Sequence, residues 1–511
     1  MTAESSDRSM TPRAEVLAAI AHLWSAQADT AVLTRALERF ADSGEEGAVG
    51  TAWWSAFDER TRCLYGWPAA RRELPDFWQW ALSVCAGDGR VREAALAPGA
   101  VPLAAGRRGV AALLAVRCAD WVEPIRAAAR AAFAQMVAAA DDAGLAWAAA
   151  SAWACEGRER GAEAVEIVAV RLADASPTVW DHLFAFPDHR VRRRALAQAA
   201  AAGRLDAARL SALAVGDSDP LVAQHAAETL LALAVPAGED SRLDAPGVEL
   251  VGRLLGARLP TVRAAVVTVL RRAQRPDLAR PFTADRSASV RQVARWVLRS
   301  CGEDPAGFCR ALLARPAREI TPGAVSGLAE CGESDDAAGY AADTALLRAQ
   351  ATHPRSKVRA AALHALGTRK PSAVTPEVLA AVLDEDPAPS VLRTAARLLE
   401  PDAAMLTRDR LDGWLAPGRP STLRRHAARL ARAAGGWNRL EANLRLLHDP
   451  DPVIARDARR STLVCAYSAT ASYRPLADGR RDVLTALLEQ AGEALDARTV
   501  DRLRFGLTVR S

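Results

Sequence analysis

The stretch VRAAAL at residues 358–363 is one copy of a short phrase that recurs along the chain and decides its fold. Each copy starts with an aliphatic residue, usually continues with arginine, and ends in small residues. Clear copies begin at Val91, Ile125, Val191, Val262, Val290, Val358 and Leu423, and weaker ones at Val222, Val391 and Ile454. Most copies are 31–34 residues apart or about twice that, and one irregular pair of intervals, 40 and 28 residues, again spans two periods. A fixed period of this length indicates stacked supersecondary units.

Composition predicts that each unit is helical. Half of the 511 residues are hydrophobic and only 5% are aromatic. Alanine dominates the hydrophobic class and has the highest helix propensity. Alternating β-branched runs with Asn-Gly turns, which indicate strands, are nearly absent. We therefore expect an all-α solenoid of about ten to twelve helical hairpins with atypical N- and C-terminal caps.

The phrase also divides the chain into segments. Residues 1–12 are polar, and we expect them to be disordered. Residues 13–85 lie off the repeat pattern and hold six of the thirteen tryptophans, which predicts a helical cap covering the first repeat. An aromatic ligand platform is the alternative interpretation of these tryptophans. Repeats are expected over 86–465 with a polar loop insertion at 236–247, and a C-terminal helical cap over 466–511.

Turns containing Asp or Pro precede many of the phrases. They read GDG at 87–89, FPDHR at 186–190, GDSDP at 216–220, DEDP at 384–387 and HDPDP at 448–452. Asp caps a following helix and Pro is tolerated in its first turn, so each phrase is expected to lie on a helix that starts at its turn. The period also demands copies near Arg158 and Val325, and TPGAVSGLAECG at 321–332 is helical enough to be a worn copy.

Turn, Val-Arg pair, paired alanines and period together resemble HEAT repeats, most closely the short bacterial variety shared with the phycocyanobilin-lyase family. In HEAT repeats an Asp in the inter-helix turn and an Arg six residues later bridge neighbouring units. The resemblance implies such bridges at Asp120 with Arg126 and at Asp285 with Arg291. Most phrase arginines are therefore expected to be structural. The ladder is expected to be broken where the arginine is lost, at Ala223, Leu392 and Ala455.

Charge and cysteine content indicate the cellular compartment of the protein but do not identify a partner. The net charge of +5 is mild and does not by itself imply a polyanionic partner. Lys357 and Lys370 are the only lysines, a bias towards arginine that is typical of a GC-rich bacterial genome, so the number of arginines is weak evidence for nucleic-acid binding. The eight cysteines include no C-x-x-C pair, so reduced thiols are expected. No signal-like or membrane-spanning apolar run is found, which predicts a cytoplasmic protein without membrane contact. A monomer is expected.

One stretch is far more basic than the rest: residues 253–299 hold eleven arginines against two aspartates. Arg291, Arg295 and Arg299 follow i, i+4, i+8 spacing and share a helix face. In HEAT units the Val-Arg helix faces the concave side, so the resemblance places part of this charge in a groove. Such a groove suits phosphates or an acidic protein segment, whereas a solvated face paired with acids is the other interpretation. The predicted basic face comprises Arg263, Arg271, Arg272, Arg291, Arg295 and Arg299.

Two enzyme classes among HEAT relatives were compared with the motifs. HEAT-like alkylpurine DNA glycosylases carry a Trp-Trp segment with an Asp four residues beyond, and WWSAFD at 53–58 places Asp58 there. The di-iron deoxyhypusine hydroxylases need His-Glu pairs, and none of the eight histidines is followed by Glu. P-loop, HExxH and G-x-S-x-G motifs are absent. We expect no catalytic residues, no metal site and no cofactor.

These observations favour a non-enzymatic HEAT-repeat scaffold or adaptor that binds a macromolecule, foremost a protein, on its concave face. The alternative is a nucleic-acid-binding protein, or a HEAT-like alkylpurine DNA glycosylase, that uses a basic groove around residues 253–299. The sequence does not identify the partner.

Overall fold

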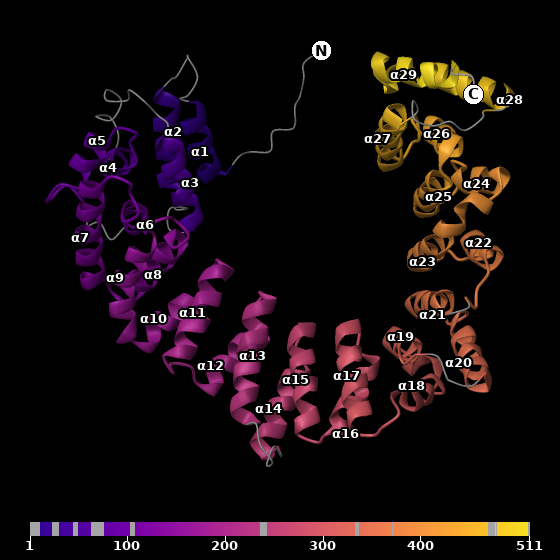
Figure 1. Cartoon of the computed structure of the whole chain (residues 1–511), viewed down its shortest axis with the longest axis horizontal. Helices are drawn as coiled ribbons and strands as arrows, with labels where there is room; N and C mark the ends of the chain where they lie inside the picture. Colours follow the sequence, from indigo (N-terminus) through magenta and orange to yellow (C-terminus); the bar gives the residue numbers. More distant parts are fainter. Residues whose placement is uncertain are drawn as a thin grey trace. The chain divides into compact units, whose positions relative to one another are not determined.

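The computed structural model describes residues 11–22, 30–43, 50–62, 76–102, 108–235, 243–332, 337–369, 372–468, 476 and 478–508. Within these ranges the chain is helical and contains no strand (Figure 1), which confirms the predicted all-α class. The chain divides into two compact units, residues 1–233 with 257–262 and residues 234–256 with 263–511.

The first unit contains the helices up to α13. They are α1 (Pro12–His22), α2 (Thr30–Asp42), α3 (Thr51–Arg62), α4 (Asp76–Val84), α5 (Gly89–Ala95), α6 (Arg108–Arg117), α7 (Glu123–Ala139), α8 (Asp142–Cys155), α9 (Ala162–Ala173), α10 (Pro177–Phe184), α11 (His189–Ala201), α12 (Ala207–Gly216) and α13 (Pro220–Ala234).

The second unit contains the helices from α14 onward. They are α14 (Ala245–Leu255), α15 (Pro260–Arg272), α16 (Pro276–Ala279), η4 (Arg280–Ala284), α17 (Ala288–Ser300), α18 (Pro305–Leu313), η5 (Ala317–Glu319), α19 (Pro322–Glu330), α20 (Ala337–Gln350), α21 (Ser356–Thr368), α22 (Pro376–Glu385), α23 (Pro389–Leu399), η6 (Glu400–Met405), α24 (Arg408–Leu415), α25 (Ser421–Ala433), α26 (Gly436–Arg445), α27 (Pro452–Ser468), α28 (Asp478–Gln490), η8 (Gly492–Ala494) and α29 (Ala497–Thr508).

Helical pairs stack in the second unit so that the helices carrying the phrase form one row. Phrase helices α21, α23 and α25 pack against one another in order, and α19, the worn copy, packs against α21 (Figure 1). Helices α18, α20, α22 and α24 each pack on the next phrase helix and form the other row. The phrase supplies the buried face, since its aliphatic residue and alanines, such as Val391, Ala395 and Ala396, point into the core. This succession is the predicted solenoid of HEAT-like hairpins.

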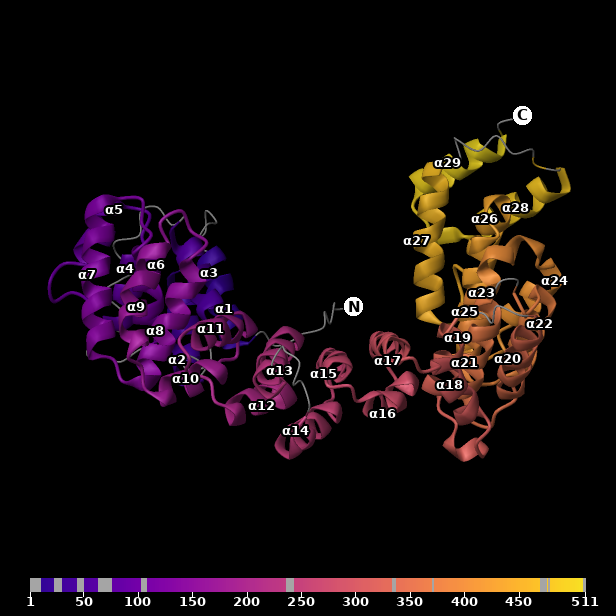
Figure 2. The ribbon, with the colours of Figure 1, turned by 60° about the horizontal axis from the view of Figure 1, so that its bottom comes forward.

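The first unit has the same two-row arrangement. Helices α4, α6 and α8 pack in order, and so do α5, α7 and α9 (Figure 2). Near Arg158, where the period demanded a phrase, a turn leads into α9, which takes the next place in the row beside α7. The repeat therefore continues although its sequence signature is lost.

The turns before the phrases cap their helices as expected. Asp88 and Asp188 accept hydrogen bonds from backbone N–H groups two residues later, at the starts of α5 and α11. Asp219 accepts hydrogen bonds from the backbone N–H groups of Leu221 and Val222 in the first turn of α13. Such bonds satisfy N–H groups that have no partner inside the helix.

Several predicted boundaries differ from the helix ends. Residues 1–10 and 236–242 lie outside the described residues, but Pro12 already begins α1 and Ala245 begins α14, inside the predicted loop. Asp244 explains the earlier start, because its side chain accepts a hydrogen bond from the N–H of Gly247. At the other end, α27 continues to Ser468, three residues beyond the predicted end of the repeats.

An arginine–carboxylate ladder connects consecutive repeats. The guanidinium of a phrase arginine donates to a backbone carbonyl six residues earlier, with N···O distances of 2.7–2.9 Å at Arg92, Arg126, Arg192, Arg291 and Arg359. In most copies its other nitrogens contact a carboxylate of the following repeat, whereas Arg126 pairs with Glu123 of its own helix. These rungs are Arg92–Asp120, Arg192–Asp217, Arg263–Asp285, Arg291–Glu330, Arg359–Asp386 and Arg424–Asp449.

The two bridges implied by the resemblance are confirmed. In each of them, the backbone and the side chain of the turn aspartate bind different arginines. Arg126 and Arg291 bond the backbone carbonyls of Asp120 and Asp285, six residues before them. The carboxylates of the same two aspartates bind the arginine of the preceding repeat. Each turn aspartate thereby joins two phrase arginines, one through its backbone and one through its side chain.

An aromatic core fills the N-terminal helices. Trp54 on α3 and Trp78 on α4 are fully buried, with ring centroids 6.0 Å apart, and Phe57 and Phe77 contact both rings. Gly109 lets α6 approach this core, because any side chain there would collide with the Trp54 ring. Trp24 and Trp67 lie outside the described residues.

The ladder predicts a large difference between two arginines of the same helix. Arg192 is buried and holds both carboxylate oxygens of Asp217 at 2.8 and 2.9 Å, whereas Arg194 pairs with Glu156 at the surface. We expect Arg192→Ala to lower the free energy of unfolding by about 3 kcal/mol, because it leaves a buried carboxylate unpaired. Arg194→Ala should cost less than about 1 kcal/mol. Urea denaturation followed by circular dichroism measures both.

A double-mutant cycle provides the control for this rung. Combining Arg192→Ala with Asp217→Ala should lower the free energy of unfolding by less than the sum of the single changes. The reason is that Asp217→Ala removes the buried carboxylate that Arg192→Ala leaves without its cation. Additive losses would show that Arg192 stabilises α11 through its aliphatic packing instead.

Candidate partner-binding surfaces

The predicted basic face lies on two adjacent phrase helices of the second unit. Helix α15 carries Arg263, Arg271 and Arg272, and α17 carries Arg291, Arg295 and Arg299. The structure separates these residues into two groups, according to whether a carboxylate neutralises the guanidinium.

Half of the predicted face belongs to the interior of the stack. Arg263 is buried, and its Nη2 lies 2.8 Å from an Asp285 oxygen. Arg291 and Arg295 are also buried, and both donate to Glu330 at the end of α19. These three arginines therefore act as ties between repeats, which corrects the expectation that they face a groove. The i, i+4 spacing of Arg291 and Arg295 is explained by one shared carboxylate.

Arg291 and Arg295 lower the pKa of the Glu330 carboxyl. Burial alone would raise the pKa of its carboxyl, but the hydrogen bonds and charges of Arg291 and Arg295 outweigh burial and hold the pKa below its ordinary value. The carboxylate thus stays ionised and paired at neutral pH.

The other half of the predicted face is at the surface. The Arg271 guanidinium lies 4.9 Å from the ring centroid of Trp296, a side chain of α17 that is 45% exposed. Arg299 donates to the backbone carbonyl of Cys331 at 2.7 Å, and Arg272 is exposed at the end of α15. An aromatic ring next to exposed guanidinium groups is a common element of protein interfaces.

Asp58, the carboxylate of the glycosylase interpretation, is not presented to any ligand. It is only 1% exposed and accepts a hydrogen bond from Arg117, which is fully buried. The neighbouring Trp54 ring is enclosed by aromatic side chains and cannot stack on a base. This geometry removes the structural basis for a catalytic role of WWSAFD.

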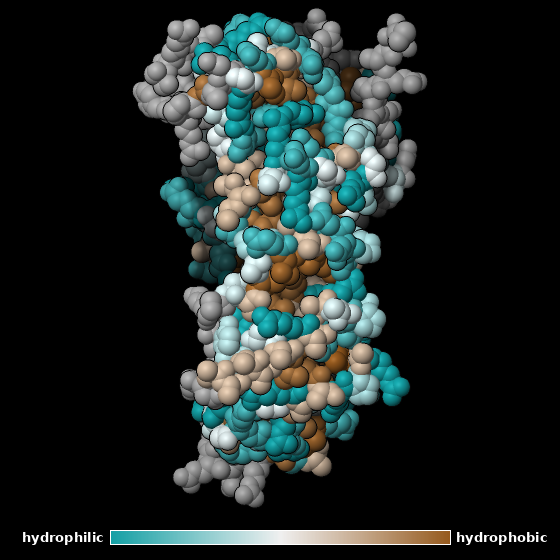
Figure 3. Space-filling view, turned by 90° about the vertical axis from the view of Figure 1, so that its right-hand side faces the viewer, coloured by the Kyte–Doolittle hydropathy of each residue, from teal (hydrophilic) through white to brown (hydrophobic). Residues whose placement is uncertain are grey.

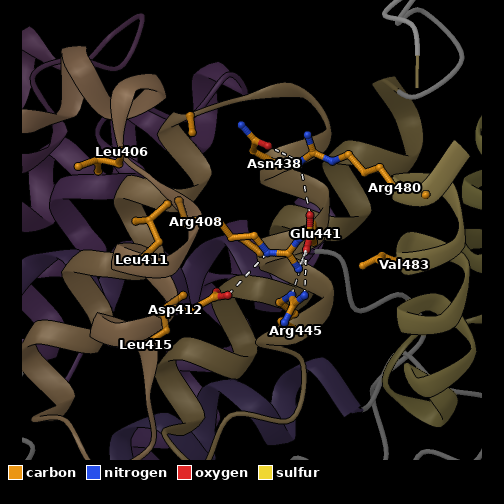
Figure 4. A pocket seen from close by; sticks show the side chains of 14 residues that line it. Leu406, Arg408, Leu411, Asp412, Leu415, Asn438, Glu441, Arg445, Arg480 and Val483 are labelled. Carbon is orange, nitrogen blue, oxygen red and sulfur yellow. Dashed lines mark hydrogen bonds and ion pairs between the residues drawn. The ribbon is translucent and has the colours of Figure 1, made fainter. Parts of the chain in front are cut away.

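A pocket of about 400 Å³ opens between α24, α26 and α28 in the second unit (Figure 4). Its apolar lining comes from two sides, with Leu406, Leu411 and Leu415 on one and Val483 of α28 on the other. Its volume lies within the roughly 300–1,000 Å³ range of ligand pockets. Sequence reasoning gave no indication of it.

Glu441 of α26 stands at the centre of the polar wall, where it is almost completely buried. Each of the three helices sends one arginine to its carboxylate (Figure 4). Arg408 lies 2.5 Å away, Arg445 bonds with Nε at 3.2 Å and Nη2 at 3.0 Å, and Arg480 lies at 3.4 Å. Arg480 also donates to Asn438. One acid thus binds three cations.

Hydrophobic residues are otherwise dispersed on the outer row of this unit. On the surface shown in Figure 3, they form separate patches between hydrophilic residues.

The described ranges contain neither a metal cluster nor a membrane span. There, no group of three His, Cys, Asp or Glu residues is arranged to hold a metal ion. In the same part of the chain, no helix combines the length and apolar character needed to cross a membrane.

No protein-family model matches the chain, and no curated protein does. Among solved structures it is similar to importin beta in an ammonium sulfate condition, with 13% identity over 96% of this chain and 72% of the other and a TM-score of 0.41. Yeast importin-beta, Kap95p, shows 12% identity over 97% and 70%, with a TM-score of 0.34. Kap121p bound to RanGTP shows 15% identity over 84% of this chain and 52% of that one, with a TM-score of 0.31.

At these identities and TM-scores the likeness transfers neither a partner nor an activity to this chain. The chain also spans only about half of the length of Kap121p.

The pairing at Glu330 predicts a pH-dependent stability. A carboxyl whose pKa is lowered on folding stabilises the folded state above its unfolded pKa of about 4.3, and this contribution is lost as the pH falls through the lower folded pKa. Glu330→Gln should therefore lower Tm at pH 7, and the difference from the unchanged protein should shrink below about pH 4. Thermal melts over this pH range measure it.

Glu319→Gln, in the exposed turn η5, is the matched control and should change Tm little at any pH. A Tm difference for Glu330→Gln that stays constant down to acid pH would contradict the assignment.

Proposed function

We propose that the chain is a helical-repeat scaffold that binds a protein partner through the surface of its phrase helices, the row that faces the concave side in HEAT repeats. One observation carries the proposal. The ladder neutralises the buried arginines of this row, while large apolar and aromatic side chains elsewhere in the row stay exposed, on α17 and on two helices that lack the phrase arginine. These are Leu221 and Leu233 on α13, Trp296 on α17, and Val464 and Tyr467 on α27.

Exposed aromatic and aliphatic groups of this kind suit a protein surface better than a phosphate backbone. Trp and Tyr supply much of the binding energy in protein interfaces, whereas nucleic-acid affinity depends mainly on unpaired cations. On α15 and α17, three of the six predicted cations are committed to Asp285 and Glu330.

The same proposal includes the cellular compartment and the oligomeric state. Each of the seven cysteines in the described part of the chain is a free thiol, which supports a reducing, cytoplasmic environment. A single chain is proposed as the working form. Kinship with the bacterial phycocyanobilin-lyase type of repeat stays a prediction.

A second candidate function, nucleic-acid binding, is favoured by the exposed part of the basic face. Arg271 lies over the exposed Trp296 ring, Arg272 and Arg299 are exposed on the same two helices, and an aromatic platform next to a guanidinium group suits single-stranded nucleic acid. Arg291 and Arg295 are unsuitable for testing it, since their loss would disrupt the rung to Glu330.

The first proposal predicts a specific loss at Trp296. The full chain should capture a protein partner from an extract of its source cells, and Trp296→Ala should weaken binding of the purified partner about tenfold or more. Trp121→Ala, at an exposed turn before α7, is the matched control and should leave the affinity unchanged. Isothermal titration calorimetry measures both. Equal affinities for the two variants would refute this face as the binding surface.

The two candidates differ in their response to salt. If protein binding is the function, the full chain should bind duplex or single-stranded DNA only weakly, and the triple change Arg271→Glu, Arg272→Glu and Arg299→Glu should have no more effect than Arg315→Glu with Arg318→Glu. A steep fall of affinity with salt, abolished by the triple change alone, would establish the second candidate instead. Fluorescence anisotropy with labelled DNA provides the measurement.

A further inference from the structure

We infer that the pocket around Glu441 is a docking site for an acidic, leucine-containing segment of a partner protein. The inference rests on the proposed function in one respect, that the chain binds protein. It concerns a different surface, because the pocket is lined mainly by α24, α26 and α28, with only the small side chain of Ala431 coming from the phrase helix α25.

The first argument is charge. Three arginines and two carboxylates, those of Glu441 and Asp412, line the pocket, which leaves one net positive charge. A guanidinium has five N–H donors, so the three arginines offer far more donors than the Glu441 oxygens can accept. The site thus has unused capacity for an anion.

The second argument is access. The side chain of Arg408 is 53% exposed and those of Arg445 and Arg480 are each 35% exposed, although all three contact the buried Glu441. Glu441 therefore acts as an anchor that holds the guanidinium groups in place at the pocket wall. Arginines held in position lose little conformational freedom when they bind a carboxylate in a two-bond arrangement.

The third argument is the apolar wall, which determines the kind of anion. Leu406, Leu411 and Leu415 from one side and Val483 from the other form a surface that a free phosphate or small dicarboxylate would leave uncovered. A leucine next to an acidic residue would bury this wall while the acid reaches the arginines. Clusters of arginine are a recurring means of recognising acidic motifs.

A purely structural role makes the opposite prediction for one substitution. If the arginines only tie three helices together, Glu441→Gln removes the shared partner and brings no benefit. If they form a receptor, the same change frees guanidinium donors and removes a repelling charge, so an acidic peptide should bind more tightly.

The test uses the full chain and a short fluorescein-labelled peptide in which glutamates stand between leucines. We expect Glu441→Gln to tighten binding several-fold and Arg408→Ala to weaken it roughly tenfold. Arg456→Ala, an exposed arginine of α27 outside the pocket, is the control and should have no effect. Circular dichroism melts of each variant separate binding changes from loss of the fold. Exchanging the glutamates of the peptide for glutamine should abolish binding.

Other outcomes overturn the inference. Succinate or phosphate binding as well as the peptide would make the pocket a small-anion site, and equal effects of Arg408→Ala and Arg456→Ala would assign the arginines to structure alone. Absence of peptide binding would reject the site. Trp296→Ala should leave peptide affinity unchanged, so failure here can be told apart from failure of the phrase-helix proposal.

Discussion

The ladder of phrase arginines is the interaction on which the rest of the structure depends. A stack of alanine-rich helices packs through small, similar surfaces that specify relative position poorly. Buried arginines such as Arg192 fix the position of one repeat relative to the next, because the planar guanidinium group binds one acceptor in its own turn and another in the next repeat. Burying the cation without both acceptors would be costly. Each of these buried arginines thus requires a carboxylate in the following repeat, most often a turn aspartate. Arginine and carboxylate together fix the position of one hairpin relative to the next.

The fold could be predicted from the sequence because its cause is local and repeated. Aliphatic residues and alanines at helical spacing, an Asp or Pro turn and a constant period each recur often enough to be recognised. The ladder was predictable where both partners follow that period, as at Asp120 and Asp285. Helix ends near Ala245 and Ser468 were missed by a few residues, because a cap or a continuing turn shifts them without changing the pattern.

The candidate sites were less predictable, because they depend on which residues the fold brings opposite each other. Arg291 and Arg295 look like part of a solvent-facing basic stripe until Glu330, on a helix without the phrase arginine, covers them. No motif or spacing in the sequence predicted the pocket around Glu441. Its arginines come from three helices separated by long stretches of chain, and each is unremarkable in its own segment. Only the stacking of α24, α26 and α28 reveals their convergence.

The missing arginines have a mechanical consequence. In a linear array each repeat contacts only its neighbours, so a joint without a rung is held by fewer interactions and is more compliant than its neighbours. In the second unit, Leu392 and Ala455 stand in place of the arginine on α23 and α27. At the joint after α23, a surface pair between Arg429 and Glu400 substitutes only weakly for a buried rung. Bending should therefore concentrate at a few joints fixed by single residues, and one arginine introduced there would stiffen the array locally.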